Sequence, residues 1–224
     1  MRSFVVGLDL GQAQDYTALA VIERVETEDK RQPSCHVRHL ERFRLGTSYP
    51  TIVERVADML SREPLAGDAS LVVDATGVGA PVVDLLREAG LRPVAVTITG
   101  GDAVGCEGRD YRVPKRDLVA TLQVLLQTGR LKVAESLPEA ATLTRELLNF
   151  QVRITDKAAD IYGVWREGGH DDLVLAVALA CWWAQQVPSP LPPARAQPTG
   201  PSRWAPVRDR TAWGGQGRRW GKKI

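Results

Sequence analysis

Three aspartates stand where apolar segments of the chain end or begin. Asp9 closes the first apolar stretch, Asp74 closes another, and Asp172 opens a long, alanine-rich apolar stretch. Carboxylates are costly to bury unless a positive charge meets them, so three of them at the ends of core elements are most simply explained by one cation site. All-oxygen ligands favour hard cations, here Mg²⁺ or Mn²⁺. Such ions activate water and stabilise the leaving oxygen in phosphodiester cleavage, so the pattern predicts a metal-dependent nuclease, with two ions expected in the active complex.

Strands and helices must bring these carboxylates together. Apolar runs alternate with short polar segments in the first half of the chain, which predicts three antiparallel strands followed by strands added in parallel through helical crossovers. The expected class is α/β, a mixed sheet flanked by helices. We expect strands over 3–10, 16–25, 35–45, 70–75, 91–98 and 129–134, helices over 51–62, 80–89, 115–127, 137–150 and 171–186, and a polar loop over 100–113.

The expected elements place the aspartates at one edge of the sheet. Asp9 and Asp74 follow the carboxyl ends of their strands, where sites of open α/β sheets form. If the two strands are neighbours, the carboxylates lie roughly 5 Å apart. Asp172 shares a helical stripe with apolar residues, so it is expected to point into the sheet. Asp171 lies about 100° around the helix from it, either as a further ligand or as an acid that favours the helix N-terminus.

Basic residues gather in two places along the folded part. Arg109 and Arg112 fall in the expected loop, and Lys115 and Arg116 fall in the first turn of the next helix, where they would hold a phosphate backbone or form a solvated patch. A second group alternates along the third strand and is interpreted as a charged edge that resists aggregation: Arg38, Arg42 and Arg44.

Length and composition allow one good core and an appendage. Of 224 residues, 44% are hydrophobic and 25% are charged, as in a folded soluble domain. No apolar run is long enough for a membrane span, and no signal peptide precedes the first strand, so a cytoplasmic protein without membrane partners is expected. Three widely spaced cysteines suit reduced thiols.

The C-terminal segment differs from the rest of the chain. Residues 188–224 are rich in Pro, Gly, Arg and Trp and are expected to be a disordered tail behind a domain spanning 1–187. Eight basic residues and one acidic residue give this tail a net charge of +7, so the remainder carries −5 within the overall +2. A basic, aromatic tail suits contact with nucleic acid or docking on a partner protein.

The order of these motifs resembles the RNase H-like superfamily, and most closely the nuclease domain of large terminase subunits from tailed phages. The resemblance covers about residues 3–186, and the His-x-Asp before an alanine-rich helix is its most specific part. The matching motifs are Gly7-Leu-Asp9-Leu-Gly-Gln-Ala-Gln-Asp15-Tyr-Thr17-Ala, Val73-Asp74-Ala-Thr-Gly-Val-Gly and Gly169-His170-Asp-Asp172-Leu-Val-Leu-Ala-Val-Ala-Leu-Ala.

The resemblance implies that Asp9, Asp74 and Asp172 are the metal-binding acids. Asp15 matches an auxiliary acid of the family, or it is a turn residue. His170 matches a common histidine that orders a water or contacts phosphate, or it is structural at the start of the helix. The implied activity is cleavage of double-stranded viral DNA concatemers during genome packaging, in the host cytoplasm.

The resemblance also implies partners that this sequence does not contain. A complete large terminase carries an ATPase motor, and no G-x-x-x-x-G-K-[ST] loop is present here, so the motor is expected to be missing or separate. Double-stranded DNA, the portal or procapsid and the small terminase subunit are the other implied partners.

Three other classes of function compete with this one. A Holliday-junction resolvase would share the fold and the acids, and a catalytically silent packaging module would share the fold alone. A sugar-kinase or actin-like nucleotide-binding protein begins similarly, but it needs two such domains to close over ATP, and this chain is too short for that.

Overall fold

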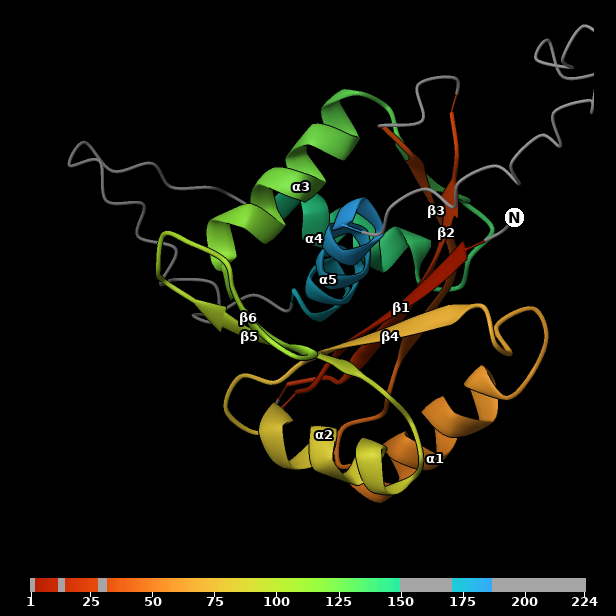
Figure 1. Ribbon diagram of the computed structural model, residues 1–224. Helices are drawn as coiled ribbons and strands as arrows, with labels where there is room; N and C mark the ends of the chain where they lie inside the picture. Colours follow the sequence, from red (N-terminus) through yellow and green to blue (C-terminus); the bar gives the residue numbers. More distant parts are fainter. Residues whose placement is uncertain (1–2, 12–14, 28–31, 150–170, 187–224) are drawn as a thin grey trace, which may run out of the picture. The chain divides into compact units, whose positions relative to one another are not determined.

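Eight strands form one mixed sheet with helices on both faces in the computed structural model, which describes residues 3–11, 15–27, 32–149 and 171–186 (Figure 1). The strands are β1 (Ser3–Asp9), β2 (Ala18–Val25), β3 (Ser34–Arg42), β4 (Ala69–Asp74), β5 (Val94–Thr99), β6 (Gly105–Glu107), β7 (Asp110–Pro114) and β8 (Leu131–Val133). The helices are α1 (Tyr49–Leu60), α2 (Gly79–Glu88), α3 (Lys115–Gln127), α4 (Ala140–Asn149) and α5 (Asp172–Gln186).

The strand order in the sheet is β6-β7-β5-β4-β1-β2-β3-β8. β1, β2 and β3 pair antiparallel, and β4, β5 and β7 extend the sheet from β1 in parallel. The expected mixed sheet, three antiparallel strands followed by parallel strands, is therefore confirmed. Helix α2 forms the crossover between the parallel neighbours β4 and β5, and α1 lies between β3 and β4 along the chain.

The segment expected to be a polar loop contains a hairpin instead. Glu107 pairs with Asp110 across a two-residue turn, and Gly108 adopts a φ of 62° there. Positive φ is what such tight turns require of their central residues, and glycine adopts it at little cost. The loop prediction is wrong for 105–107 and 110–113, because β7 pairs in parallel with β5, and the local polar pattern does not reveal this partner.

Side chains on the two faces of the sheet build two separate cores. Along β1, Val6 and Leu8 pack with α1 and α2, whereas Val5 faces the layer of α3, α4 and α5. Successive residues of a strand point to opposite faces. Asp9, four residues after Val5, therefore belongs to the α5 face.

Helix α5 is the central helix of its layer and is buried around almost its whole circumference. It packs on β1 so closely that a Cβ atom added to Gly7 would lie 2.0 Å from the carbonyl oxygen of Ala176. The expected one-sided apolar stripe is wrong, because a helix covered on all sides has no polar face. The position of Asp172 at the first turn, rather than a stripe, brings it to the sheet.

Strand β3 is not the charged edge expected from its arginines. β8 pairs with Cys35–Val37, so β3 is not an edge strand. The pairing of β3 with β2 shifts between Val21 and Ile22, so that no residue of β2 pairs with Arg38. This bulge changes which residues face which side. Arg38 is exposed, whereas Arg42 pairs with Ala18 and lies on the α5 face.

The chain divides into two compact units, Met1–Pro190 and Leu191–Ile224. The second unit lies wholly outside the described residues, so the expected tail over 188–224 stays a prediction. None of the described helices has the length and apolar character needed to cross a membrane.

Candidate active site at the carboxyl ends of β1 and β4

Asp9 and Asp74 lie side by side in neighbouring strands. Leu8 pairs with Val73 in the parallel register of β1 and β4, so the next residues along, the two aspartates, lie at the same level. Both are buried, each with 3% of its surface exposed. The sequence placed these carboxylates together on the condition that the two strands are neighbours, and β1 and β4 are neighbours; both carboxylates fall on the α5 face.

Asp172 reaches the same edge from above. It is the first residue of α5 and is 6% exposed. Ala176, one helical turn further on, touches β1 at Gly7, two residues before Asp9. Four residues of helix and two residues of strand both span about 6 Å. The close contact of Ala176 with Gly7 therefore places Asp172, four residues before Ala176, next to Asp9, two residues after Gly7.

A small hollow of about 20 Å³ lies between these elements. Such a volume is enough for a single water or a bare ion. The hollow brings together four of the predicted site residues, while Asp74 is not among the described residues that line it. The lining consists of Asp9, Leu10, Gly11, Asp15, Asp171, Asp172 and Leu175.

The turn after β4 holds the carboxylate of Asp74. The backbone N–H of Thr76 donates to Asp74 Oδ1 at 2.8 Å, and Thr76 Oγ1 accepts from the N–H of Ile98 in β5 at 2.9 Å. A Cβ atom on Gly79 would lie 1.9 Å from the carbonyl oxygen of Asp74. The glycine therefore allows α2 to begin directly against the strand, and the turn orients the acid.

A basic residue that the sequence prediction assigned to the sheet edge lies in this site. The residue is Arg42, and Ala18 of β2 lies between it and Asp9: Ala18 pairs with Asp9 of β1 on one side and with Arg42 of β3 on the other. Arg42 Nη2 donates to Asp172 Oδ2 at 3.0 Å, and the guanidinium carbon of Arg42 lies 4.1 Å from the centre of the Tyr16 ring. The signal available in the sequence was weak: Arg42 follows Leu40 by two, the spacing of one strand face.

A fourth buried acid fixes the start of α5. Glu146 of α4 is 6% exposed, and its Oε2 accepts from the backbone N–H groups of Leu173 and Val174 at 3.1 and 3.2 Å. These are donors that a helix leaves without intrahelical partners. Burial raises the pKa of Glu146 from 4.5 to about 7, against the opposing effect of Arg42. Sequence reasoning missed this residue, although it shares a buried helix face with Leu143.

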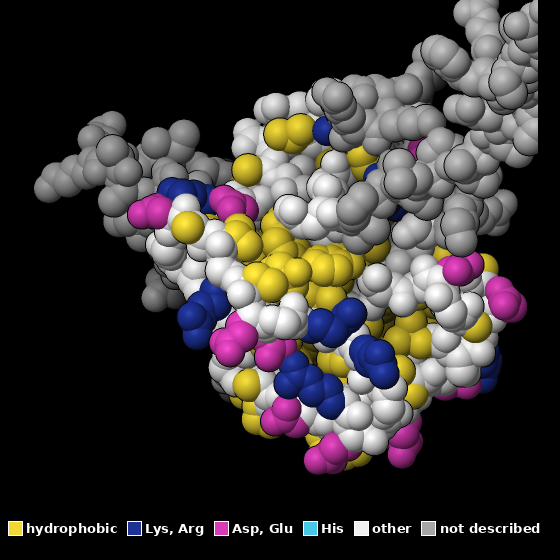
Figure 2. Space-filling model, in the orientation of Figure 1, with side chains coloured by type: hydrophobic (Ala, Val, Ile, Leu, Met, Phe, Trp, Pro, Cys, Tyr) yellow, Lys and Arg dark blue, Asp and Glu magenta, His cyan; other side chains and the backbone are white. Residues whose placement is uncertain are grey.

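The predicted DNA-binding residues are dispersed over the turn before β7, β7 itself and the start of α3. Arg109 donates to the carbonyl oxygen of Arg92 at 2.8 Å, and Arg116 binds Asp102 through its carboxylate at 2.7 Å and its carbonyl at 2.6 Å. Arg112 is exposed and Lys115 is half-buried. On the face shown in Figure 2, basic side chains lie beside acidic ones around an apolar patch.

Two further observations concern the predicted metal site. His170 lies outside the described residues. In the described ranges, no group of three or more His, Cys, Asp or Glu residues stands ready-arranged to hold a metal. The donor chemistry nevertheless fits a hard cation, because the charged side chains that line the hollow are all carboxylates and Asp172 already binds a cationic group.

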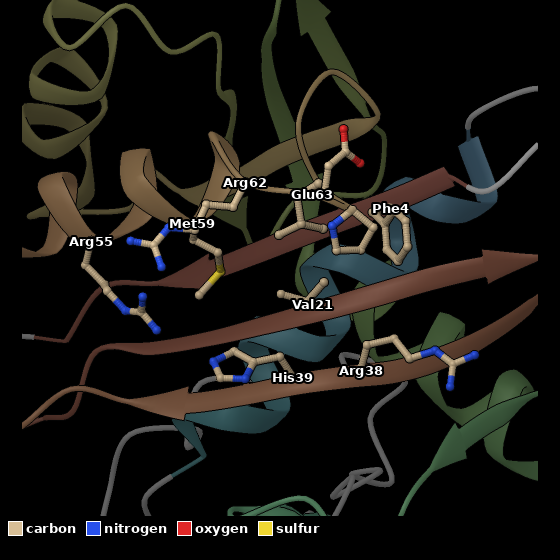
Figure 3. Close-up of a pocket in the computed structure, with 10 residues that line it drawn as sticks. Phe4, Val21, Arg38, His39, Arg55, Met59, Arg62 and Glu63 are labelled. Atoms are coloured by element: carbon tan, nitrogen blue, oxygen red, sulfur yellow. The ribbon is translucent and has the colours of Figure 1, made fainter.

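A larger hollow lies on the opposite face of the sheet, beside α1 (Figure 3). It measures about 330 Å³ and has an apolar floor that includes Phe4 and Val21. Its arginines are already engaged, since Arg55 binds Glu41 at 3.0 Å and Arg38 binds Glu23 at 2.7 Å. This hollow contains none of the predicted site residues.

Three antiparallel strands extended by parallel ones, with acids at the ends of the first and fourth strands and at the start of the covering helix, define a nuclease domain of RNase H-like fold. The large terminase nuclease from the thermophilic phage G20c is similar in structure: it is 24% identical, the match covers 80% of this chain and 81% of that one, and the TM-score is 0.51. At this identity the likeness establishes the fold.

The chain belongs to the terminase RNase H-like domain family, whose sequence profile matches residues 6–181. Two more distant structures also match. The nuclease domain of the bacteriophage SPP1 large terminase, solved with bound Mn, is 16% identical over 80% of this chain and 84% of that one, with a TM-score of 0.49. RuvC of Thermus thermophilus is 14% identical over 82% and 96%, with a TM-score of 0.41. No curated protein sequence matches the chain.

Proposed function

We propose that this chain is a metal-dependent endonuclease that cleaves double-stranded viral DNA during genome packaging. The observation that carries the proposal is the register of β1 and β4, which sets Asp9 and Asp74 side by side beneath the first residue of α5. Family membership supports the substrate class, because terminase nuclease domains act on packaged DNA.

Asp9, Asp74 and Asp172 would hold the metal, with Asp15 and Asp171 as outer members. Mg²⁺ or Mn²⁺, with two ions in the active complex, would supply activation of water and stabilisation of the leaving oxygen. The chain's own contribution is orientation. The Thr76 N–H holds Asp74, and Glu146 holds the first turn of α5 and thereby Asp172.

The DNA would be held through its backbone rather than read by base. Arg112 and Lys115, exposed or half-buried at the end of β7 and the start of α3, are the best placed of the predicted contacts. Arg109 and Arg116 already bind protein oxygens and would act mainly by shaping this surface. Contacts of this kind carry no sequence preference and weaken with salt.

The remaining partners follow from the family. We propose that an ATPase motor, the portal or procapsid and the small terminase subunit work with this domain in the host cytoplasm. Each is an expectation for the packaging machine, and cleavage can be tested without any of them.

The test is nicking of supercoiled plasmid in Mg²⁺ or Mn²⁺ by the wild-type chain and by Asp74→Asn. Asparagine keeps the acceptor for the Thr76 N–H but removes the charge that binds metal, so we expect a loss of roughly 100-fold or more with the fold intact. Asp84→Asn is the matched control, because Asp84 is an exposed acid on α2 that pairs with Arg87 at the surface. Wild-type cleavage by Asp74→Asn would refute the assignment. Preferential cutting of four-way junctions would point instead to a resolvase.

A further inference from the structure

The candidate site contains a cation supplied by the protein itself. Arg42 projects from the end of β3, its side chain is 15% exposed, and its Nη2 lies 3.0 Å from Asp172 Oδ2. Packing over the Tyr16 ring at 4.1 Å holds the guanidinium in place. Arginine keeps its charge at any relevant pH, so this positive charge is permanent.

A charge is needed here because the acids lie close together. Asp9, Asp74 and Asp172 are each at least 94% buried, and like charges in so little solvent repel; Glu146, equally buried, adds a fourth carboxyl group. Arg42 relieves part of this repulsion at Asp172. The hydrogen bond from Arg42 occupies a lone pair of Asp172 Oδ2 and withdraws electron density from the carboxylate, so it weakens Asp172 as a ligand for a divalent ion.

A second acceptor for Arg42 lies within reach. Glu146 Oε1 is 3.9 Å from the same Nη2, it is buried, and no hydrogen bond reaches it from the described residues. Arg42 Nε is likewise buried and makes no hydrogen bond within the described part of the chain. A shift of about 1 Å would convert the contact between Arg42 and Glu146 into a hydrogen bond of ordinary length.

We propose that Arg42 is an internal counter-cation of the metal site: it neutralises Asp172 when no metal is bound and transfers to Glu146 when a divalent ion takes Asp172. Arg42 is then a positioning residue that sets the affinity for metal by competition. The inference rests on the proposed metal site. It predicts that the loss of Arg42 tightens metal binding, whereas the loss of an arginine that only stabilises the fold would leave the metal affinity unchanged or lower it.

The experiment measures Mn²⁺ binding calorimetrically, together with thermal unfolding in EDTA, for the wild-type chain and Arg42→Gln. Removal of the competing cation should tighten Mn²⁺ binding by roughly tenfold, the value of one charge-assisted hydrogen bond. The same change should lower the unfolding temperature in EDTA. Arg42→Lys, which keeps the charge without the planar fork, should fall between the two.

Arg38→Gln is the matched control, because Arg38 lies on the same strand and is paired with Glu23 at 2.7 Å, away from the site. Its Mn²⁺ affinity should equal that of the wild type. A double-mutant cycle tests the transfer: Glu146→Gln should weaken Mn²⁺ binding more in the wild-type background than in Arg42→Gln.

The outcomes separate this inference from the proposed function. If the wild-type chain binds no Mn²⁺, or binds it equally well as Asp74→Asn, the metal site itself is refuted. If Mn²⁺ binding requires Asp74 but is equal or weaker in Arg42→Gln, the counter-cation role is overturned and the metal site stands. If Arg42→Gln does not fold, an unchanged or weaker affinity in Arg42→Lys overturns the role.

Discussion

At the scale of single residues, the candidate site is a balance of buried charges. Three aspartates and Glu146 converge on a region where the described side chains supply one guanidinium, that of Arg42. Glu146 has two functions in this balance. One oxygen caps the start of α5, and the other faces Arg42.

The raised pKa of Glu146 predicts how the metal-free protein responds to pH. Burial holds the carboxyl protonated up to about pH 7, compared with 4.5 in the unfolded chain. The folded state therefore binds more protons between these values, and the free energy of unfolding should fall as the pH rises from about 4.5 to 7. Denaturant titrations in EDTA at pH 5, 6, 7 and 8 measure this.

Glu146→Gln is the informative variant for that titration, because glutamine still accepts from the Leu173 N–H but does not ionise. We expect its stability to change less over this pH range than that of the wild type. An identical pH dependence in both proteins would show that another group is responsible.

At the scale of elements, the contact between β1 and α5 positions Asp172. Gly7 admits the backbone of α5 at Ala176, and no larger residue fits without displacing the helix. Helix α4 contributes Glu146, and the turn between β4 and α2 contributes the N–H that holds Asp74. Three separate packing contacts thus orient the acids.

Gly7→Ala tests this contact. Its Cβ would lie 2.0 Å from Ala176 O, so α5 must move away, with a loss of about 1–3 kcal/mol in the free energy of unfolding, as for other overpacked cores. Plasmid nicking should fall as well, because Asp172 moves with the helix. Chemical denaturation and the nicking assay together measure both effects.

Gly100→Ala is the control for Gly7→Ala, since an added Cβ there meets nothing within 4 Å. It should leave stability and nicking close to the wild-type values. Full stability in Gly7→Ala would mean that α5 adapts without cost and does not depend on this contact.

At the scale of the whole molecule, the chain combines a mildly acidic body with a strongly basic C-terminal segment. We interpret residues 188–224 as a tail that docks on a partner or contacts DNA, behind a domain that ends near residue 187. Basic segments release counterions from DNA when they bind, so a contribution to DNA affinity would depend steeply on salt.

A chain ending at residue 187 tests the proposed boundary. It should unfold with the same midpoint as the full chain and should retain metal-dependent nicking at low salt. If the tail contacts DNA, the truncated chain should also show a smaller dependence of affinity on salt concentration. Loss of cooperative unfolding would place the boundary of the domain further along the chain.

Much of the architecture follows from local patterns in the sequence. Asp9 and Asp74 were predicted to meet because each lies at the carboxyl end of an apolar strand, on the condition that the two strands are neighbours. The helix over 115–127 was predicted with the observed bounds. The hairpin of β6 and β7 was not, because β7 is stabilised by its pairing with β5 rather than by its own composition.

The sequence by itself determined which acids end strands and which acid begins the last helix, because strand ends and helix starts are properties of neighbouring residues. Only the tertiary structure decided what surrounds them. Arg42 meets Asp172 across 130 positions of the chain, and Glu146 meets the start of α5 across 27. The bulge at Arg38 turns Arg42 inward, and such a bulge arises from the pairing of β2 with β3 rather than from either strand alone.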